Sequence, residues 1–271
     1  MMPRRLSRTV AAAAAGGLVV LIAAATLIPT KKGVAFVAGS AALWIAFATT
    51  LWRRRALNVP TTGSNLDVAD TLGAATVVTL ARALLLCVLA GLLLAPLAPD
   101  LLPWLPGALY TAAAIGDAVD GALARRLGRT TKLGASLDVT TDAVGLFVAP
   151  LLAVVHGRLP PWYLLLSVAY PLFQAGVWLR GRLRLPAHPE RVRPYPAARF
   201  FAGAQMVVVA AALFPWLPRL LLWPVATIVM LPTLLLFARE WRLMAAPSGA
   251  GAQPAAEIQH AAGRIGPGPQ R

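Results

Sequence analysis

The chain has 271 residues, of which 58% are hydrophobic and only 13% are charged, and its mean hydropathy is +0.69. This composition excludes an ordinary soluble domain and predicts an all-α, polytopic integral membrane helical bundle. The net charge of +15 does not indicate a nucleic-acid partner, because no basic face alternates with exposed aromatic residues on a soluble module. It is typical of a membrane protein that contacts anionic lipid or phosphate.

Eight apolar segments follow one another along the chain, each close to the roughly 20 residues that span a bilayer. They cover residues 10–28, 33–52, 77–97, 102–124, 137–155, 162–178, 200–213 and 220–237. The seventh segment is short, and the eighth contains Pro224 and Pro232, which predict a kink. The sequence therefore predicts eight membrane helices.

These helices are expected to form a hairpin and a core. Residues 1–55 predict an N-terminal transmembrane hairpin, and residues 77–242 predict a six-helix core. A cleaved signal peptide is the alternative for the first segment, but its apolar run is longer than the usual signal core, which favours a retained helix. Residues 56–76 are expected to form a polar, interfacial connector. Residues 243–271, rich in Gly, Pro, Ala and Gln, predict a disordered tail.

The basic residues predict the orientation in the membrane. If the N-terminus is cytoplasmic, only four of the 25 Lys and Arg residues face outward: Lys31, Lys32, Arg158 and Arg219. Cytoplasmic loops carry an excess of Lys and Arg, so we expect a multi-pass protein of the cell membrane with both termini and the active site in the cytoplasm. Cys87 is the only cysteine, which excludes an internal disulfide and a cysteine metal cluster.

One stretch of the chain combines apolar surroundings with acidic residues. Four of the ten acidic residues lie between Asp117 and Asp142. An ionisable group at membrane depth is costly unless it is solvated, paired or bound to a metal. Asp117 and Asp120 are three apart, and Asp138 and Asp142 are four apart, so each pair shares one helix face. Two such helices can converge into an all-oxygen site for Mg²⁺ or Mn²⁺, with room for two ions.

The same stretch resembles a family signature. It reads Asp-x2-Asp-Gly-x2-Ala-Arg-x8-Gly-x3-Asp-x3-Asp, the pattern of the class I CDP-alcohol phosphatidyltransferases, and it matches every fixed position. These are membrane enzymes of phospholipid synthesis, and the resemblance covers roughly residues 76–242. A proton relay or ion path of a transporter is the alternative for the carboxylates. A transporter would not require Gly121, Ala124, Arg125 and Gly134 at fixed offsets.

The resemblance implies a role for each motif carboxylate. Asp117, Asp120 and Asp138 would be metal ligands that hold a diphosphate through the ions. Asp142 would be the catalytic general base that takes the proton of the acceptor hydroxyl, and it could also contact a metal.

A second group of residues is expected to bind the nucleotide of the donor. It consists of Thr79, Gly121, Ala124, Arg125, Thr131 and Gly134. Gly121 and Ala124 would let a pyrimidine nucleotide approach the backbone, although small residues also serve helix packing. Arg125 could bind two phosphate oxygens at once, or it could be an interfacial charge.

Two further elements match the family only in part. Thr76-x2-Thr79-x2-Arg82 resembles an Asn/Asp-x2-Thr-x2-Arg element beside the nucleotide, and its hydroxyls could instead bond to their own helix backbone. Arg180 and Arg199 could form an acceptor-binding pocket for a phosphorylated alcohol, or they could be ordinary positive-inside charges.

The resemblance implies transfer of a phosphatidyl group from a CDP-alcohol, CDP-diacylglycerol above all, to a small polar or phosphorylated alcohol, with release of CMP. Transfer of a CDP-linked headgroup to diacylglycerol is the alternative within the class. Outside it, the alternatives are a metal-dependent membrane transporter and a catalytically silent binding protein. The implied partners are the CDP-alcohol lipid donor, the alcohol acceptor, membrane lipid and a second copy of the chain.

Overall fold

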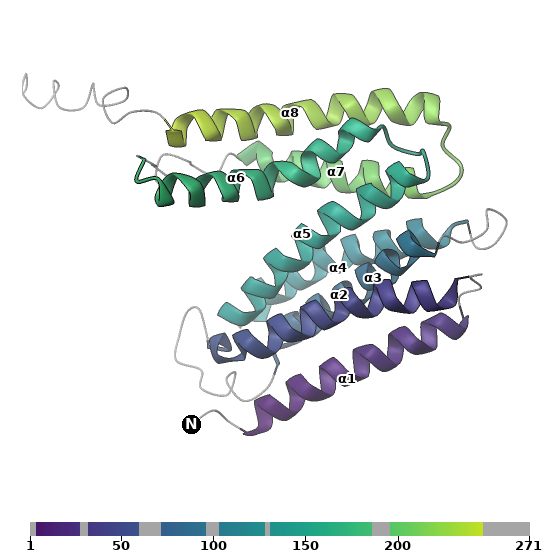
Figure 1. Cartoon of the computed structure of the whole chain (residues 1–271), viewed down its shortest axis with the longest axis vertical. Coiled ribbons are helices and arrows are strands. Elements are labelled where there is room, and N and C mark those ends of the chain that lie inside the picture. The colour runs from purple at the N-terminus through teal and green to yellow at the C-terminus, as the bar shows by residue number, and fades with distance from the viewer. Residues whose placement is uncertain are drawn as a thin grey trace, which may run out of the picture.

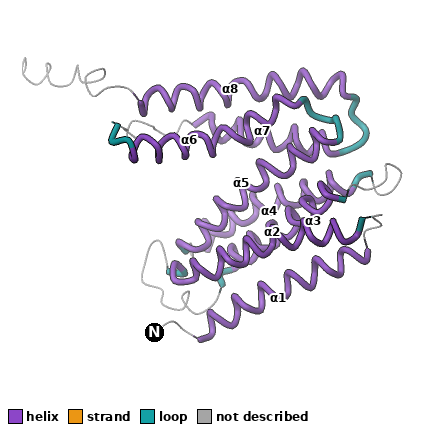
Figure 2. The backbone as a smooth tube through the Cα atoms, in the orientation of Figure 1, coloured by secondary structure: helices purple, strands orange, loops and turns teal. Residues whose placement is uncertain are grey.

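The computed structural model describes residues 4–27, 32–59, 72–95, 103–127, 131–185 and 196–245. These residues form eight α-helices and two short 3-10 helices, and they contain no strand (Figure 2). The α-helices are α1 (Arg4–Leu27), α2 (Gly33–Arg54), α3 (Ala74–Leu94), α4 (Leu105–Leu127), α5 (Lys132–Val155), α6 (Leu164–Arg182), α7 (Pro196–Leu213) and α8 (Arg219–Ala245). The 3-10 helices are η1 (Arg55–Leu57) and η3 (Pro161–Tyr163). One helix lies at each predicted segment, and the predicted all-α membrane bundle is confirmed.

The helices form two groups with α5 between them (Figure 1). One group contains α1, α2, α3 and α4, and the other contains α6, α7 and α8. In the first group α3 is central, because it packs against α2, α4 and α5. The two groups also meet directly, since α4 contacts α7. This arrangement places α3, α4 and α5, which carry the motif and its upstream element, side by side.

Length and composition identify fewer membrane spans than helices. Within the described residues, five helices are long and apolar enough to cross a membrane, namely α1, α2, α3, α5 and α8. The η3–α6 segment adds a sixth if its two parts, bent by 42°, form one span. The apolar part of α7, Phe200–Leu213, is shorter, and α4 is made less apolar by Asp117 and Asp120. The prediction of eight spans therefore exceeds the number that these criteria support.

The N-terminal pair of helices packs onto the rest of the bundle through α3. Trp44 of α2 donates from Nε1 to the carbonyl oxygen of Ala14 in α1 at 2.8 Å. A Cβ at Gly91 of α3 would come within 2.8 Å of Phe36 in α2, so the glycine permits a close approach of the two helices. The division into domains remains a prediction, and residues 60–71 of the connector and 246–271 of the tail lie outside the described residues.

Candidate active site and metal centre

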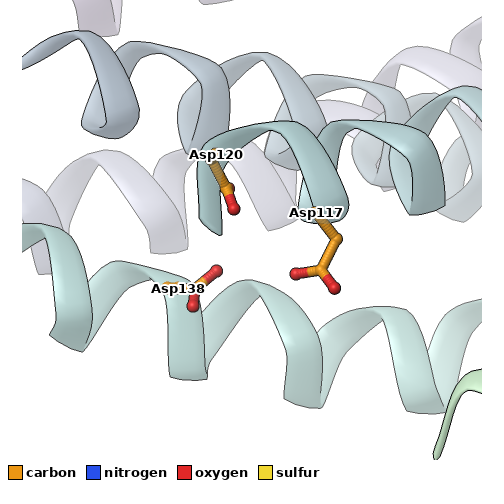
Figure 3. Close-up of side chains that lie close together, drawn as sticks. All are labelled: Asp117, Asp120 and Asp138. Carbon is orange, nitrogen blue, oxygen red and sulfur yellow. The ribbon is translucent and has the colours of Figure 1, made fainter. Parts of the chain in front are cut away.

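Three Asp side chains from two helices converge in one place. Asp117 and Asp120 lie in α4 and Asp138 lies in α5, and the three side chains point toward one another (Figure 3). One carboxylate oxygen of each lies within 4.8 Å of the chosen oxygens of the other two. The structure thus brings together the three residues that the sequence predicts as metal ligands.

A single arginine, Arg82 of α3, contacts all four motif carboxylates. Its Nη1 lies 2.8 Å from Asp120 Oδ2 and 2.8 Å from Asp138 Oδ1. Its Nη2 lies 2.8 Å from Asp117 Oδ1 and 2.7 Å from Asp142 Oδ1. The planar guanidinium presents donors in a fixed fork, which lets one side chain serve several oxygens. One positive charge therefore offsets part of the charge of four carboxylates.

The site is closed on the side of Arg82 and open on the other. The side chains of Arg82 and Asp120 are 6% and 7% exposed, whereas those of Asp117, Asp138 and Asp142 are 32%, 41% and 43% exposed. Arg82 contacts one oxygen of each carboxylate and leaves the second oxygen to other partners. Hard oxygen donors of this kind suit divalent cations such as Mg²⁺ and Mn²⁺. The residues present therefore fit a divalent metal.

The position of Arg82 depends on a glycine in the neighbouring helix. The Nε of Arg82 donates to the carbonyl oxygen of Ala113 in α4 at 3.2 Å. A Cβ at Gly116 would come within 2.7 Å of Arg82 Cγ, so a larger residue would displace the arginine. The sequence places Arg82 in an element beside the nucleotide and does not reveal its contact with the carboxylates. The feature of the sequence that could have predicted this contact is the position of Arg82 in an apolar segment, where an arginine needs an acidic or polar partner.

Three of the predicted nucleotide residues lie around α3 and the start of α5. The Thr79 hydroxyl lies 3.0 Å from the carbonyl oxygen four residues earlier and 3.2 Å from Asp120 Oδ2, so it can donate to either. Thr131 is the N-cap of α5, and its Oγ1 accepts a hydrogen bond from Gly134 N at 3.0 Å. A Cβ at Gly134 would come within 3.0 Å of Thr76 Oγ1, so this glycine permits a close approach of α5 to α3.

The remaining predicted site residues are less closely connected to the cluster. Gly121 follows Asp120 in α4 and is half-buried. The side chains of Ala124, Arg125 and Arg199 lie outside the described part of the chain. Arg180 lies near the end of α6, where its Nη2 donates to the carbonyl oxygen of Ala245 at 3.4 Å. The predicted acceptor role of Arg180 and Arg199 therefore stays a prediction.

A cavity of about 310 Å³ lies beside Asp142 and Arg82. Residues from all six helices between α3 and α8 line it, and most of them are apolar. Gln205 of α7 is a polar exception: it accepts a hydrogen bond from the Tyr163 hydroxyl and donates to the carbonyl oxygen of Val229 at 2.7 Å. The sequence does not predict this cavity, because its walls come from segments far apart in the chain.

Comparison with known proteins identifies a family. Residues 72–238, more than half of the chain, match the model of a family described as CDP-alcohol phosphatidyltransferase. The matched region runs from just before α3 into α8, and it contains the four motif carboxylates and Arg82. The chain matches no curated protein and no solved structure.

Proposed function

The chain belongs to the CDP-alcohol phosphatidyltransferase family, and from this premise we propose that it transfers the phosphatidyl group of CDP-diacylglycerol to the hydroxyl of a second alcohol. Members of the family are membrane-bound, divalent-metal-dependent phosphotransferases that use CDP-alcohol donors and alcohol acceptors. The observation that carries the proposal is the convergence of Asp117, Asp120 and Asp138 from two helices. We assign the cofactor as Mg²⁺ or Mn²⁺, with two ions.

The three converging carboxylates would hold the metal. Each has an oxygen that Arg82 does not contact, and Asp117 and Asp138 are partly open to solvent. A divalent ion bound there would offset the negative charge of the donor diphosphate and the charge that develops on the oxygens of the transferred and leaving groups. Arg82 would orient the carboxylates from the buried side. In other metal sites, residues that hydrogen-bond to the ligands fix their orientation in the same way.

In the proposed reaction, Asp142 acts as the general base. The oxygen of the acceptor alcohol forms a bond to the donor phosphorus that carries the lipid, and its proton passes to the Asp142 carboxylate. The bond between that phosphorus and the bridging oxygen breaks, and CMP leaves with the electron pair. The position of Asp142 at the cavity wall, next to Arg82, supports this role.

The nucleotide is assigned to the open side of α4 and the start of α5. Gly121 and Ala124 allow it to approach the helix, and Arg125 binds a phosphate oxygen. Thr79, Thr131 and Gly134 lie next to this region through the contacts described above. We place the site at the cytoplasmic face of the membrane, where a CDP-lipid can present its nucleotide.

A second route within the family is transfer of a CDP-linked headgroup to diacylglycerol. The cavity beside Asp142 favours it, because apolar walls suit a lipid acceptor better than a small polar one. The two routes share the metal, the base and the release of CMP, so the choice between them concerns the substrates alone.

The proposed function is tested by metal-dependent release of CMP. Purified protein in detergent should release CMP from a CDP-alcohol when Mg²⁺ or Mn²⁺ and an acceptor are present, and chelation should abolish the release. Asp117→Asn removes an anionic ligand, so metal affinity and CMP release should fall together. Substitution of groups that only contact metal ligands typically reduces metal affinity about 10–100-fold, and we expect at least that loss here. Asp70→Asn, a change outside the motif, is the matched control. Normal CMP release by Asp117→Asn would refute the metal site.

A further inference from the structure

The N-terminal pair of helices ends beside the helix that carries half of the acidic motif. Both α1 and α2 precede the region that matches the family, which begins at residue 72. Besides its packing on α3, α2 contacts α5, and so does η1, the short helix that follows α2. Residues 54–59, which we call the hairpin end, therefore lie against the helix of Asp138 and Asp142.

The hairpin end forms a defined turn. The guanidinium carbon of Arg55 lies 4.2 Å from the centre of the Trp52 ring, and its Nη1 donates to the Trp52 carbonyl oxygen. Asn58 is only 2% exposed, and its backbone N donates to the carbonyl oxygen of Arg55 at 3.1 Å. These contacts close the turn after α2, and the carbonyl group of Val59 that follows it reaches α5.

Two hydrogen bonds join the hairpin end to the first turns of α5. The backbone N of Lys132 donates to the carbonyl oxygen of Val59 at 3.0 Å. Lys132 is the first residue of α5, and the first N–H groups of a helix have no partner within it. One turn further along, Ser136 Oγ accepts a hydrogen bond from Arg54 Nη1. Contacts at two points one turn apart restrict both the position and the rotation of the start of α5.

These contacts lie on the side of α5 away from the metal ligands. Ser136 precedes Asp138 by two residues, which is about 200° around the helix. Asp138 points toward Asp117 and Asp120 of α4 (Figure 3), so the hairpin end holds α5 from nearly the opposite side. It can therefore support the position of Asp138 without covering the carboxylates.

We propose that the hairpin end is a positioning element of the active site. By holding the first two turns of α5, it keeps Asp138 at the distance from Asp117 and Asp120 that a divalent cation requires. Arg54 and the Val59 carbonyl group act through α5 and touch neither the metal nor the substrate. This inference rests on the proposed function, and it gives two helices outside the matched region a part in metal binding.

The bond to Val59 can be removed while the start of α5 is retained. Proline lacks the backbone N–H and is tolerated at the first position of a helix. The preceding residue, Thr131, has the extended backbone (φ −108°, ψ 151°) that a residue before proline adopts. Lys132→Pro therefore removes this hydrogen bond, whereas Lys132→Ala loses the same side chain and keeps the bond. We expect the affinity for Mn²⁺, measured by electron paramagnetic resonance on purified protein in detergent, to fall about threefold to tenfold in Lys132→Pro. Lys132→Ala is the matched control and should bind Mn²⁺ as the parent does.

A double-mutant cycle tests the side-chain contact. Arg54→Ala and Ser136→Ala should each weaken Mn²⁺ binding about threefold to tenfold. The double variant should lose no more than the weaker binder of the two, because both substitutions remove the same interaction. Arg54→Lys keeps a donor and should restore most of the affinity. Arg53→Ala, which removes the same charge from the preceding exposed position, is the control. Additive losses, or an equal loss in Arg53→Ala, would contradict the assignment.

Hydrogen–deuterium exchange of residues 133–140 in the metal-free protein gives a readout that needs neither metal nor turnover. Exchange should be faster in Lys132→Pro and Arg54→Ala than in the parent and the two controls. Unchanged exchange, or faster exchange with unchanged Mn²⁺ affinity, would overturn the inference.

Failure of the inference and failure of the proposed function give different results. If the parent binds Mn²⁺ and releases CMP, and Lys132→Pro and Arg54→Ala bind Mn²⁺ equally well, only the inference is wrong. If the parent itself binds no Mn²⁺, the proposed function fails and the inference fails with it. Where both hold, the Mn²⁺ concentration for half-maximal CMP release should rise in these variants by the same factor as the loss of affinity. At saturating Mn²⁺, CMP release should approach that of the parent, as expected for residues that position a metal ligand.

Discussion

The four motif carboxylates differ in what surrounds them. Asp117, Asp120 and Asp138 face one another, whereas Asp142 lies one helical turn beyond Asp138 and lines the cavity. Carboxylates that face one another can share a cation, and a carboxylate at a cavity wall can reach a substrate hydroxyl. Within one motif, position separates the proposed ligands from the proposed base.

The difference predicts a split between two single substitutions. Asp142→Asn should abolish turnover, since general bases contribute about a hundredfold to ten-thousandfold to rate and a carboxamide cannot accept the proton. It should leave metal-dependent binding of a CDP-lipid largely intact. Asp138→Asn should weaken that binding, because in the proposed site the metal would bind the diphosphate. Binding of the same CDP-lipid, measured for both variants in one detergent, checks the prediction. An equal loss in both would make Asp142 a ligand and not the base.

Arg82 predicts how the stability of the protein depends on metal. Arg82→Gln leaves four carboxylates without their shared counter-ion, and loss of one partner of a buried ion pair is strongly destabilising. We expect a loss of about 3 kcal/mol in the metal-free protein, at the lower end of that range because three of the carboxylates are partly exposed. A divalent ion can replace the lost charge, so Mg²⁺ should raise the Tm of the variant more than that of the parent. An equal rise in both proteins would contradict this role.

At the scale of elements, one arginine connects the α5–η3 loop to the end of α7 by hydrogen bonds. Arg158 donates from Nε to the carbonyl oxygen of Ala212 at 3.1 Å. Its Nη2 donates to the carbonyl oxygens of Phe214 at 2.6 Å and Leu217 at 2.7 Å. The last carbonyls of a helix lack partners within it, and a cation near them is favourable. Arg158 therefore links the loop after α5 to the C-terminal end of α7 and the loop that follows it.

Removal of this link should lower the stability of the whole bundle. Arg158→Ala eliminates three hydrogen bonds from a charged donor, and we expect a loss of about 2 kcal/mol. Thermal unfolding in detergent, with retained secondary structure as a check on folding, measures the change. Arg53→Ala, at an exposed position of α2, is the control and should unfold as the parent does. An Arg158→Ala variant as stable as this control would show that the carbonyls find other partners.

At the scale of the whole molecule, residues at the two ends of α2 can be used to test which face of the membrane carries the active site. Lys32 and Arg53 lie exposed at its two ends. The carboxylates lie toward the Arg53 end, because Val59 accepts a hydrogen bond from Lys132 N at 3.0 Å and Arg54 contacts Ser136, shortly before Asp138. The positive-inside pattern predicts that this end lies in the cytoplasm.

Cysteine labelling tests this orientation. A membrane-impermeant thiol reagent should label Lys32→Cys in intact cells, and it should label Arg53→Cys only after the inner face is exposed. The native Cys87 is fully buried and should contribute little background. The reverse labelling pattern would place the carboxylates outside and would remove the proposed cytoplasmic route for the nucleotide.

Local patterns in the sequence predict most of the fold and part of the site. Apolar runs of membrane length predict helices because a spanning segment has to satisfy its own backbone hydrogen bonds. The spacing of Asp117 and Asp120, and of Asp138 and Asp142, predicts two shared helix faces for the same local reason. The prediction of eight spans exceeds what length and composition support in the described residues, because it counts segments that contain polar residues, such as α4 with Asp117 and Asp120, or that are short, such as the apolar part of α7.

The sequence by itself determined the helices, the acidic motif and the family, because each depends on residues close together in the chain or at fixed offsets. Only the tertiary structure decided that Arg82, 38 residues before Asp120 and 60 before Asp142, meets the carboxylates. That contact requires α3, α4 and α5 to pack closely, with Gly116 leaving room for the arginine. The cavity likewise arises from the packing of six helices. Contacts of this kind depend on how distant segments pack, and the local spacing of residues carries no record of it.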